Sequence, residues 1–69
     1  MNEELKLLSK WTARLWAIYT RFVGIELTDE AADELLELTK QVWTDSGQNE
    51  LIEDMIVAFT NDIERRNNG

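Results

Sequence analysis

The chain has 69 residues, which is enough for one small domain and too few for two. It contains no cysteine, histidine or proline, so disulfides, metal sites built on thiolates or imidazoles, and histidine-based catalysis are excluded. Fourteen acidic and seven basic side chains give a net charge of −7, which repels phosphate backbones and attracts basic protein surfaces.

A first helix is predicted over residues 3–23, where apolar side chains recur at spacings of three and four. Lys6, Lys10, Arg14 and Arg21 share the opposite side of this helix. We expect these cations to form ion pairs with the acidic helices, each contributing less than about 1 kcal/mol. The expected apolar face consists of Leu5, Leu7, Leu8, Trp11, Leu15, Trp16, Ile18, Tyr19, Phe22 and Val23.

A second helix is predicted over residues 28–45. Thr28 is a good N-cap, and Gly47 is suited to the left-handed conformation that follows many helix ends. The expected buried stripe consists of Ala31, Ala32, Leu35, Leu36, Leu38, Val42 and Trp43. The outer side of the same helix carries a field of carboxylates, formed by Asp29, Glu30, Asp33, Glu34 and Glu37.

A third helix is predicted over residues 49–65, with Asn49 or Ser46 as its cap. Val57 lies outside the apolar stripe of this helix, and we expect residues 67–69 to form a frayed tail. The stripe consists of Leu51, Ile52, Met55, Ile56, Phe59 and Ile63.

These elements predict an all-α protein, a three-helix antiparallel bundle that forms a single domain over residues 1–69. Short connections favour neighbouring helices that run in opposite directions, and the broad apolar face of the first helix is expected to form the central wall. A homodimer could complete this bundle, because a domain of this size buries only a modest part of its surface.

No residue pattern indicates catalysis. Carboxylates are the only candidate acids or bases, and they lie on predicted solvent faces rather than in a cleft that would separate their pKa values. The oxygen-rich segment 45–50 misses the calcium-loop spacing, because Glu50 occupies its glycine position and Ile56 its final carboxylate position. We therefore predict that the chain is not an enzyme and binds no cofactor or metal.

Nucleic acids and membranes are poor candidate partners. A DNA-recognition helix needs cations near its start, but the first turns of the third helix carry Glu50, Glu53 and Asp54. The first helix has the basic and aromatic residues of a surface-lying helix, yet the remaining acidic chain would be repelled by anionic lipid. The longest apolar run, residues 15–19, is too short to span a membrane, and the N-terminus lacks a signal-peptide pattern; we expect a cytoplasmic protein.

Protein interaction is the interpretation that remains. The carboxylates of the second helix can imitate a phosphate backbone and bind a basic surface, while Trp16, Trp43 and Val57 form a candidate apolar interface. Size and charge are typical of phage or mobile-element antagonists, so we expect a regulator or inhibitor that blocks a larger protein by stoichiometric binding. The alternative is a structural or assembly protein that acts as a helical homodimer.

Overall fold

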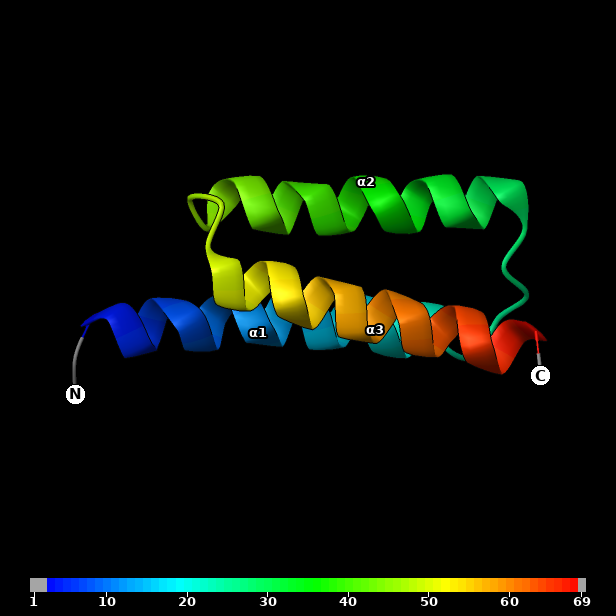
Figure 1. Cartoon of the computed structure of the whole chain (residues 1–69), viewed down its shortest axis with the longest axis horizontal. Helices are drawn as coiled ribbons and strands as arrows, with labels where there is room; N and C mark the ends of the chain where they lie inside the picture. Colours follow the sequence, from blue (N-terminus) through cyan, green and yellow to red (C-terminus); the bar gives the residue numbers. More distant parts are fainter. Residues whose placement is uncertain (1–2, 69) are drawn as a thin grey trace.

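The computed structural model describes residues 3–68, which form three α-helices and no strand. Helix α1 spans Glu3–Phe22, α2 spans Asp29–Asp45 and α3 spans Glu50–Asn68. The all-helical class and the three helices predicted from the sequence are confirmed for this part of the chain. The chain runs along α1, turns back through α2 and turns again into α3, giving an elongated body of 40 × 18 × 17 Å (Figure 1).

The side chains of predicted cap residues form the hydrogen bonds at the starts of α2 and α3. The Thr28 hydroxyl accepts a hydrogen bond at 3.1 Å from the backbone N–H three residues later, as expected of an N-cap. Asn49 caps α3, because its Oδ1 accepts from the N–H two residues later at 2.9 Å. Ser46, the other candidate, donates instead to the carbonyl of Trp43 at 2.8 Å and so belongs to the end of α2.

The turn after α2 has two residues in the left-handed region. Gly47 has φ of +75°, as its position predicted, and Gln48 has φ of +60°, which the sequence did not indicate. The N–H of Gln48 donates to the carbonyl of Trp43 at 2.9 Å, and the N–H of Gly47 donates to that of Thr44 at 3.0 Å. This pair of bonds is the Schellman arrangement, which satisfies carbonyls that the helix end leaves free.

Helix α3 continues to Asn68, three residues beyond the expected end at residue 65. The predicted frayed tail is therefore helical as far as Asn68, and Gly69 lies outside the described residues. Asn67 provides a reason for the extra length, because its Nδ2 donates to the carbonyl of Ile25 at 3.1 Å and ties α3 to the α1–α2 connection.

The core consists of two layers, and each helix contributes one buried side chain to each layer. Because every layer needs all three helices, none of the helices can bury its apolar side without the other two. Trp11, Ile18, Tyr19, Met55, Ile56 and Phe59 are half-buried around these layers. The first layer is Leu15, Val42 and Ile52, and the second is Phe22, Leu35 and Ile63.

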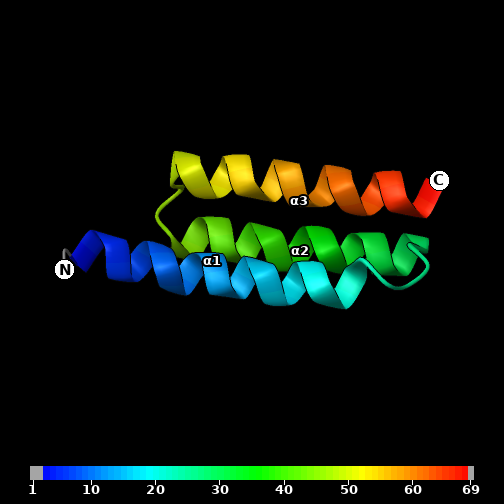
Figure 2. The ribbon, with the colours of Figure 1, turned by 90° about the horizontal axis from the view of Figure 1, so that it is seen from below.

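Several residues expected in the apolar faces are not buried. Leu5 and Leu7 are exposed in the first turns of α1, which project beyond the ends of the other two helices (Figures 1 and 2). Leu51 is exposed in the first turn of α3. Leu5 and Leu7 lie where neither α2 nor α3 extends far enough to cover them.

Helix α2 gives the largest correction. Leu36 was expected in the core and is instead 67% exposed, the highest value among the exposed large apolar residues described. Thr39, which the apolar pattern passed over, is buried. Its hydroxyl donates to the carbonyls of Leu35 and Leu36, both at 3.0 Å, so α2 itself satisfies this buried polar group.

Candidate functional site

The polar contacts between helices all involve α1 or its connection to α2. Helices α2 and α3 each pack against α1 more extensively than against one another. Within residues 3–68, no side-chain hydrogen bond or ion pair joins α2 to α3. The expectation that cations of the first helix pair with acidic residues is confirmed twice. The contacts from α1 are Arg14–Asp45 at 3.1 Å, Arg21–Glu34 at 2.5 Å and Tyr19–Asp62 at 2.5 Å.

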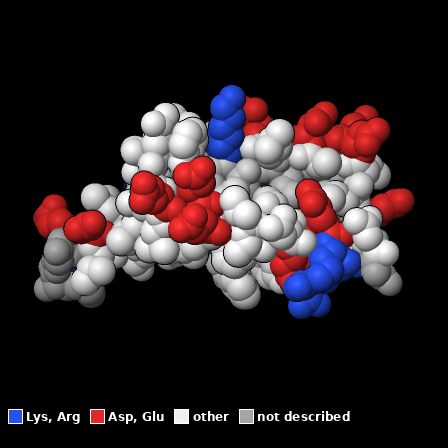
Figure 3. All heavy atoms as spheres, viewed as in Figure 1, with Lys and Arg blue, Asp and Glu red and all other residues white. Residues whose placement is uncertain are grey.

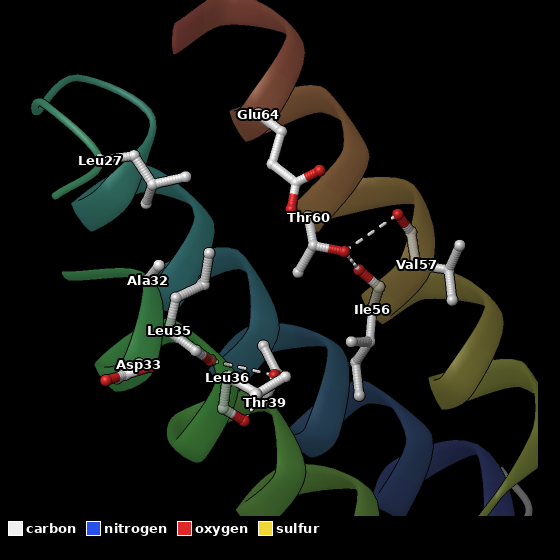
Figure 4. Close-up of a pocket in the computed structure, with 10 residues that line it drawn as sticks. All are labelled: Leu27, Ala32, Asp33, Leu35, Leu36, Thr39, Ile56, Val57, Thr60 and Glu64. Atoms are coloured by element: carbon white, nitrogen blue, oxygen red, sulfur yellow. Dashed lines mark hydrogen bonds between the residues drawn. The ribbon is translucent and has the colours of Figure 1, made fainter. Parts of the chain in front are cut away.

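A groove lies between α2 and α3, on a side to which α1 contributes no lining residue (Figure 4). It consists of two adjoining hollows of about 410 and 350 Å³, which share Leu36, Thr39, Ile56 and Val57. Leu36 and Val57 are more than half exposed. The other lining residues are Leu27, Ala32, Asp33, Leu35, Thr60 and Glu64 in the first hollow, and Lys40, Trp43 and Glu53 in the second.

The threonines in the groove do not offer free donors. Thr60 donates to the carbonyl of Ile56 at 2.8 Å and to that of Val57 at 3.2 Å, and Thr39 bonds to its own helix in the same way (Figure 4). Since each hydroxyl hydrogen is used within its own helix, the floor of the groove is chemically apolar. Trp43 also lines the groove, and its Nε1 is enclosed without an acceptor among the described residues.

The edges of the groove are charged. Asp33, Glu53 and Glu64 line it, with Lys40 as the one cation in the lining. Figure 3 shows acidic side chains gathered over one half of α2 and over the start of α3, with uncharged surface and one basic side chain between them. An apolar strip with an acidic border is therefore exposed on this face of the molecule.

The five carboxylates predicted as an acidic face are all exposed on α2, but they are not equivalent. Glu34 is paired with Arg21, so its charge is partly neutralised within the chain. Asp33 lies at the border of the groove. Within the described part of the chain, the residues of this face that make no ion pair are Asp29, Glu30, Asp33 and Glu37.

The three residues of the predicted apolar interface do not form one patch. Trp43 and Val57 meet in the groove, where Leu36 joins them. Trp16 is 58% exposed and lies elsewhere, with its ring stacked on Tyr19 at a centroid distance of 5.4 Å. Leu36 was not recognised as a surface residue from the sequence. The adjacent pair Leu35–Leu36 indicated it, because neighbouring positions on a helix point about 100° apart and one narrow core cannot enclose both side chains.

The contact between α1 and α3 is closed by an aromatic cluster and one carboxylate. Tyr19 packs on Phe59 at 5.1 Å between ring centroids, and its hydroxyl donates to Asp62. Asp62 also accepts hydrogen bonds from Arg66, at 2.8 Å, and from Arg65. The bond from Tyr19, followed by that from Arg66, lowers the pKa of Asp62 to about 2, while the carboxylate raises the pKa of Tyr19 above its ordinary value.

The groove lining combines charged, hydroxyl and apolar side chains. Its polar side chains are three carboxylates, one lysine, two threonines whose hydroxyl hydrogens are used within their own helices, and Trp43, whose Nε1 is enclosed. Residues 3–68 contain no group of three potential ligands placed to hold a metal ion. None of the three helices combines the length and the apolar character needed to cross a bilayer over the residues described.

No protein-family model matches the chain, and no curated protein or solved structure is significantly similar to it. A functional proposal therefore depends on the residues and their geometry alone.

Proposed function

We propose that this chain is a protein-interaction module that inhibits or regulates a larger protein by stoichiometric binding to a basic surface of that protein. The scaffold in this proposal is the antiparallel three-helix bundle that the sequence predicts. The observation that carries the proposal is the row of exposed carboxylates on α2. Four of them make no ion pair within the described chain, and one of these four, Asp33, lines an apolar groove.

The two features have complementary roles in such a complex. Carboxylates on a rigid helix attract a basic surface over about 10 Å at moderate salt and orient it during encounter. Apolar contacts that become fully desolvated then supply most of the affinity. Asp33 belongs to both features, because it is part of the acidic face and lines the groove. If the basic surface normally binds nucleic acid, occupation by these carboxylates would block that binding.

Charge reversal on α2 tests the proposal. We expect the double variant Asp33→Lys, Glu37→Lys to lose stoichiometric binding to the partner while it keeps its helical content, because neither residue makes an ion pair. Glu34 is left unchanged, since its replacement would also break the contact with Arg21. The control is Glu26→Lys, Asp54→Lys, which changes the net charge by the same amount at exposed positions outside the groove lining and the acidic face.

The measurement uses tagged wild-type and variant proteins in extracts of the native host, followed by light scattering of any complex. A protein retained in a fixed ratio by the wild type and the control, and released by the α2 variant, is the expected result. Equal retention by all three proteins would contradict a role for the acidic face. Failure of the wild type to form any stoichiometric complex would contradict the proposed function itself.

A homodimer is the second candidate, and the exposure of Trp16 favours it. This ring is 58% exposed although it stacks on Tyr19 and lies edge-on to Phe59, so a second copy could cover a preformed aromatic surface. Sedimentation equilibrium distinguishes the two candidates. A dimer that Trp16→Glu dissociates would favour an assembly role, whereas a monomer at high concentration would argue against it.

A further inference from the structure

We propose that the α2–α3 groove receives one amphipathic α-helix from the partner, with apolar residues along one side and Lys or Arg along both edges. This inference rests on the proposed function and specifies what part of a partner the module recognises. Its basis is the combination of an uncovered apolar strip, a lining whose charged side chains are three carboxylates and one lysine, and the absence of α1 side chains from that lining.

The dimensions of the groove suit a short helix. On α3 the lining extends from Glu53 to Glu64, eleven residues further along, which corresponds to roughly 17 Å at the helical rise of 1.5 Å per residue. A partner helix of about three turns fills this length. Two helices packed on a third leave one open position beside them, and an added helix there would complete a four-helix arrangement.

The chemistry of the lining favours a helix over an extended peptide. The backbone groups of α2 and α3 are bonded within their helices, and Thr39 and Thr60 use their hydroxyl hydrogens in the same way. An extended peptide would therefore find few partners for its own backbone groups. A helix satisfies its backbone internally and needs only apolar contacts from the floor, which Leu36, Ile56 and Val57 provide.

The charge of the border favours a basic occupant. Asp33 of α2 and Glu53 and Glu64 of α3 lie on opposite sides of the strip, with Lys40 as the cation among the lining residues. A second copy packed groove to groove would bring two acidic borders together, and each chain carries a net charge of −7. Lysines or arginines that flank an apolar stripe would face Glu53 and Glu64 on α3 and Asp33, which shares its edge with Lys40, on α2.

A synthetic peptide tests this inference directly. The probe is a fluorescent amphipathic peptide with Leu at helical spacing on one side and Lys at the remaining positions, and a second peptide has Glu in place of every Lys. Fluorescence anisotropy at low salt should show saturable binding of the lysine peptide in a one-to-one ratio and no binding of the glutamate peptide. Affinity should fall as salt is added, because the border charges are solvent-exposed.

Substitutions then locate the site. Leu36→Lys and Val57→Lys should each weaken binding by about tenfold or more, since they place a cation and remove an apolar contact within the groove. Leu7→Lys is the matched control, because Leu7 is 52% exposed and lies in the first turns of α1, outside the groove lining. Circular dichroism of all three variants should match the wild type, since each replaced side chain is already more than half exposed.

Each result has a definite meaning. Equal loss of binding in the Leu7 control and the groove variants would show that charge alone attracts the peptide, and would overturn the inference. Equal binding of the glutamate peptide would do the same. A wild-type dimer dissociated by Leu36→Lys would assign the groove to a second copy and overturn it as well. A host complex that needs Asp33 and Glu37 but tolerates Leu36→Lys would reject the groove and leave the proposed function standing.

Discussion

Helix α3 has two contact sides that differ in how they are closed. Toward α1, Tyr19 packs on Phe59 and its hydroxyl reaches Asp62, so rings and a carboxylate bridge the helices. Toward α2, aliphatic residues and threonines leave a groove in which Leu36 and Val57 remain exposed. The difference is one of side-chain length and chemistry, because long side chains with polar ends join helices that short aliphatic ones leave apart.

This contrast also shows why α1 is the centre of the molecule. Helices α2 and α3 each pack against it more extensively than against one another, and it supplies one member of each ion pair that links two helices among the described residues. Helices α2 and α3 are consequently fixed relative to each other through α1 and the turn that connects them. The groove between α2 and α3 is lined without any residue of α1.

The largest expected effect is the difference in stability loss between a core substitution and a groove substitution. Phe22→Ala removes a side chain that is 1% exposed in the second core layer and should lower the free energy of unfolding by about 3–5 kcal/mol. Leu36→Ala should lower it by less than about 0.5 kcal/mol, because that leucine is already mostly in water. Urea unfolding followed by circular dichroism measures both values. A large loss for Leu36→Ala would mean that the groove is occupied in the free protein.

The next effect is a pH dependence specific to the α1–α3 side. The folded pKa of Asp62 is lowered to about 2 from an ordinary value of 3.8, so the ionised carboxylate stabilises the folded state. This stabilisation is complete above pH 3.8 and is lost as the pH falls toward 2. Asp62→Asn should therefore be less stable than the wild type at neutral pH, and the difference should shrink across that interval.

Asp33→Asn is the matched control for this effect, because it removes the same charge on the groove side, where Asp33 makes no ion pair. Thermal unfolding of the wild type and both variants between pH 2 and pH 7 measures the difference. An Asp62→Asn variant that stays equally destabilised at the lowest pH would show that lost packing, rather than the hydrogen-bonded charge, causes its effect.

Much of the fold follows from local sequence signals. Helical period, the Thr28 cap and the glycine at position 47 identify three helices and their boundaries to within about three residues. The end of α3 could not be predicted in the same way, because Asn67 is held by a carbonyl of the α1–α2 connection, 42 positions away in the chain. Local propensity carries no information about such a contact.

The candidate site was only partly predictable, for a different reason. The carboxylates of α2 are evident in the sequence, and their exposure follows from the helical period. Leu36 was predicted to be a core residue because periodicity identifies the apolar side of a helix. It does not give the width of that side that the neighbouring helices cover. The separation of Trp16 from Trp43 and Val57 depends on how the helices are placed around α1, which no local pattern specifies.

The smallest expected effect concerns the ion pair that connects α1 to the acidic face. Arg21 and Glu34 are 2.5 Å apart, but their side chains are 58% and 47% exposed, so water screens the attraction. A double-mutant cycle with Arg21→Gln and Glu34→Gln should give a coupling energy of about 0.2–1 kcal/mol that decreases with added salt. Arg21 also lies over the ring of Phe22. The cycle cancels this contact, because Arg21→Gln removes it both from the wild type and from the Glu34→Gln variant.

The variant Arg21→Gln should also change the affinity for a basic peptide. Arg21 neutralises one of the five carboxylates of α2, so Arg21→Gln should leave Glu34 free to join the other four. We expect this variant to bind the lysine peptide slightly more tightly than the wild type at low salt, with no difference at high salt. Unchanged affinity together with zero coupling would mean that Glu34 already belongs to the free acidic field, and that α1 does not moderate the charge of this surface.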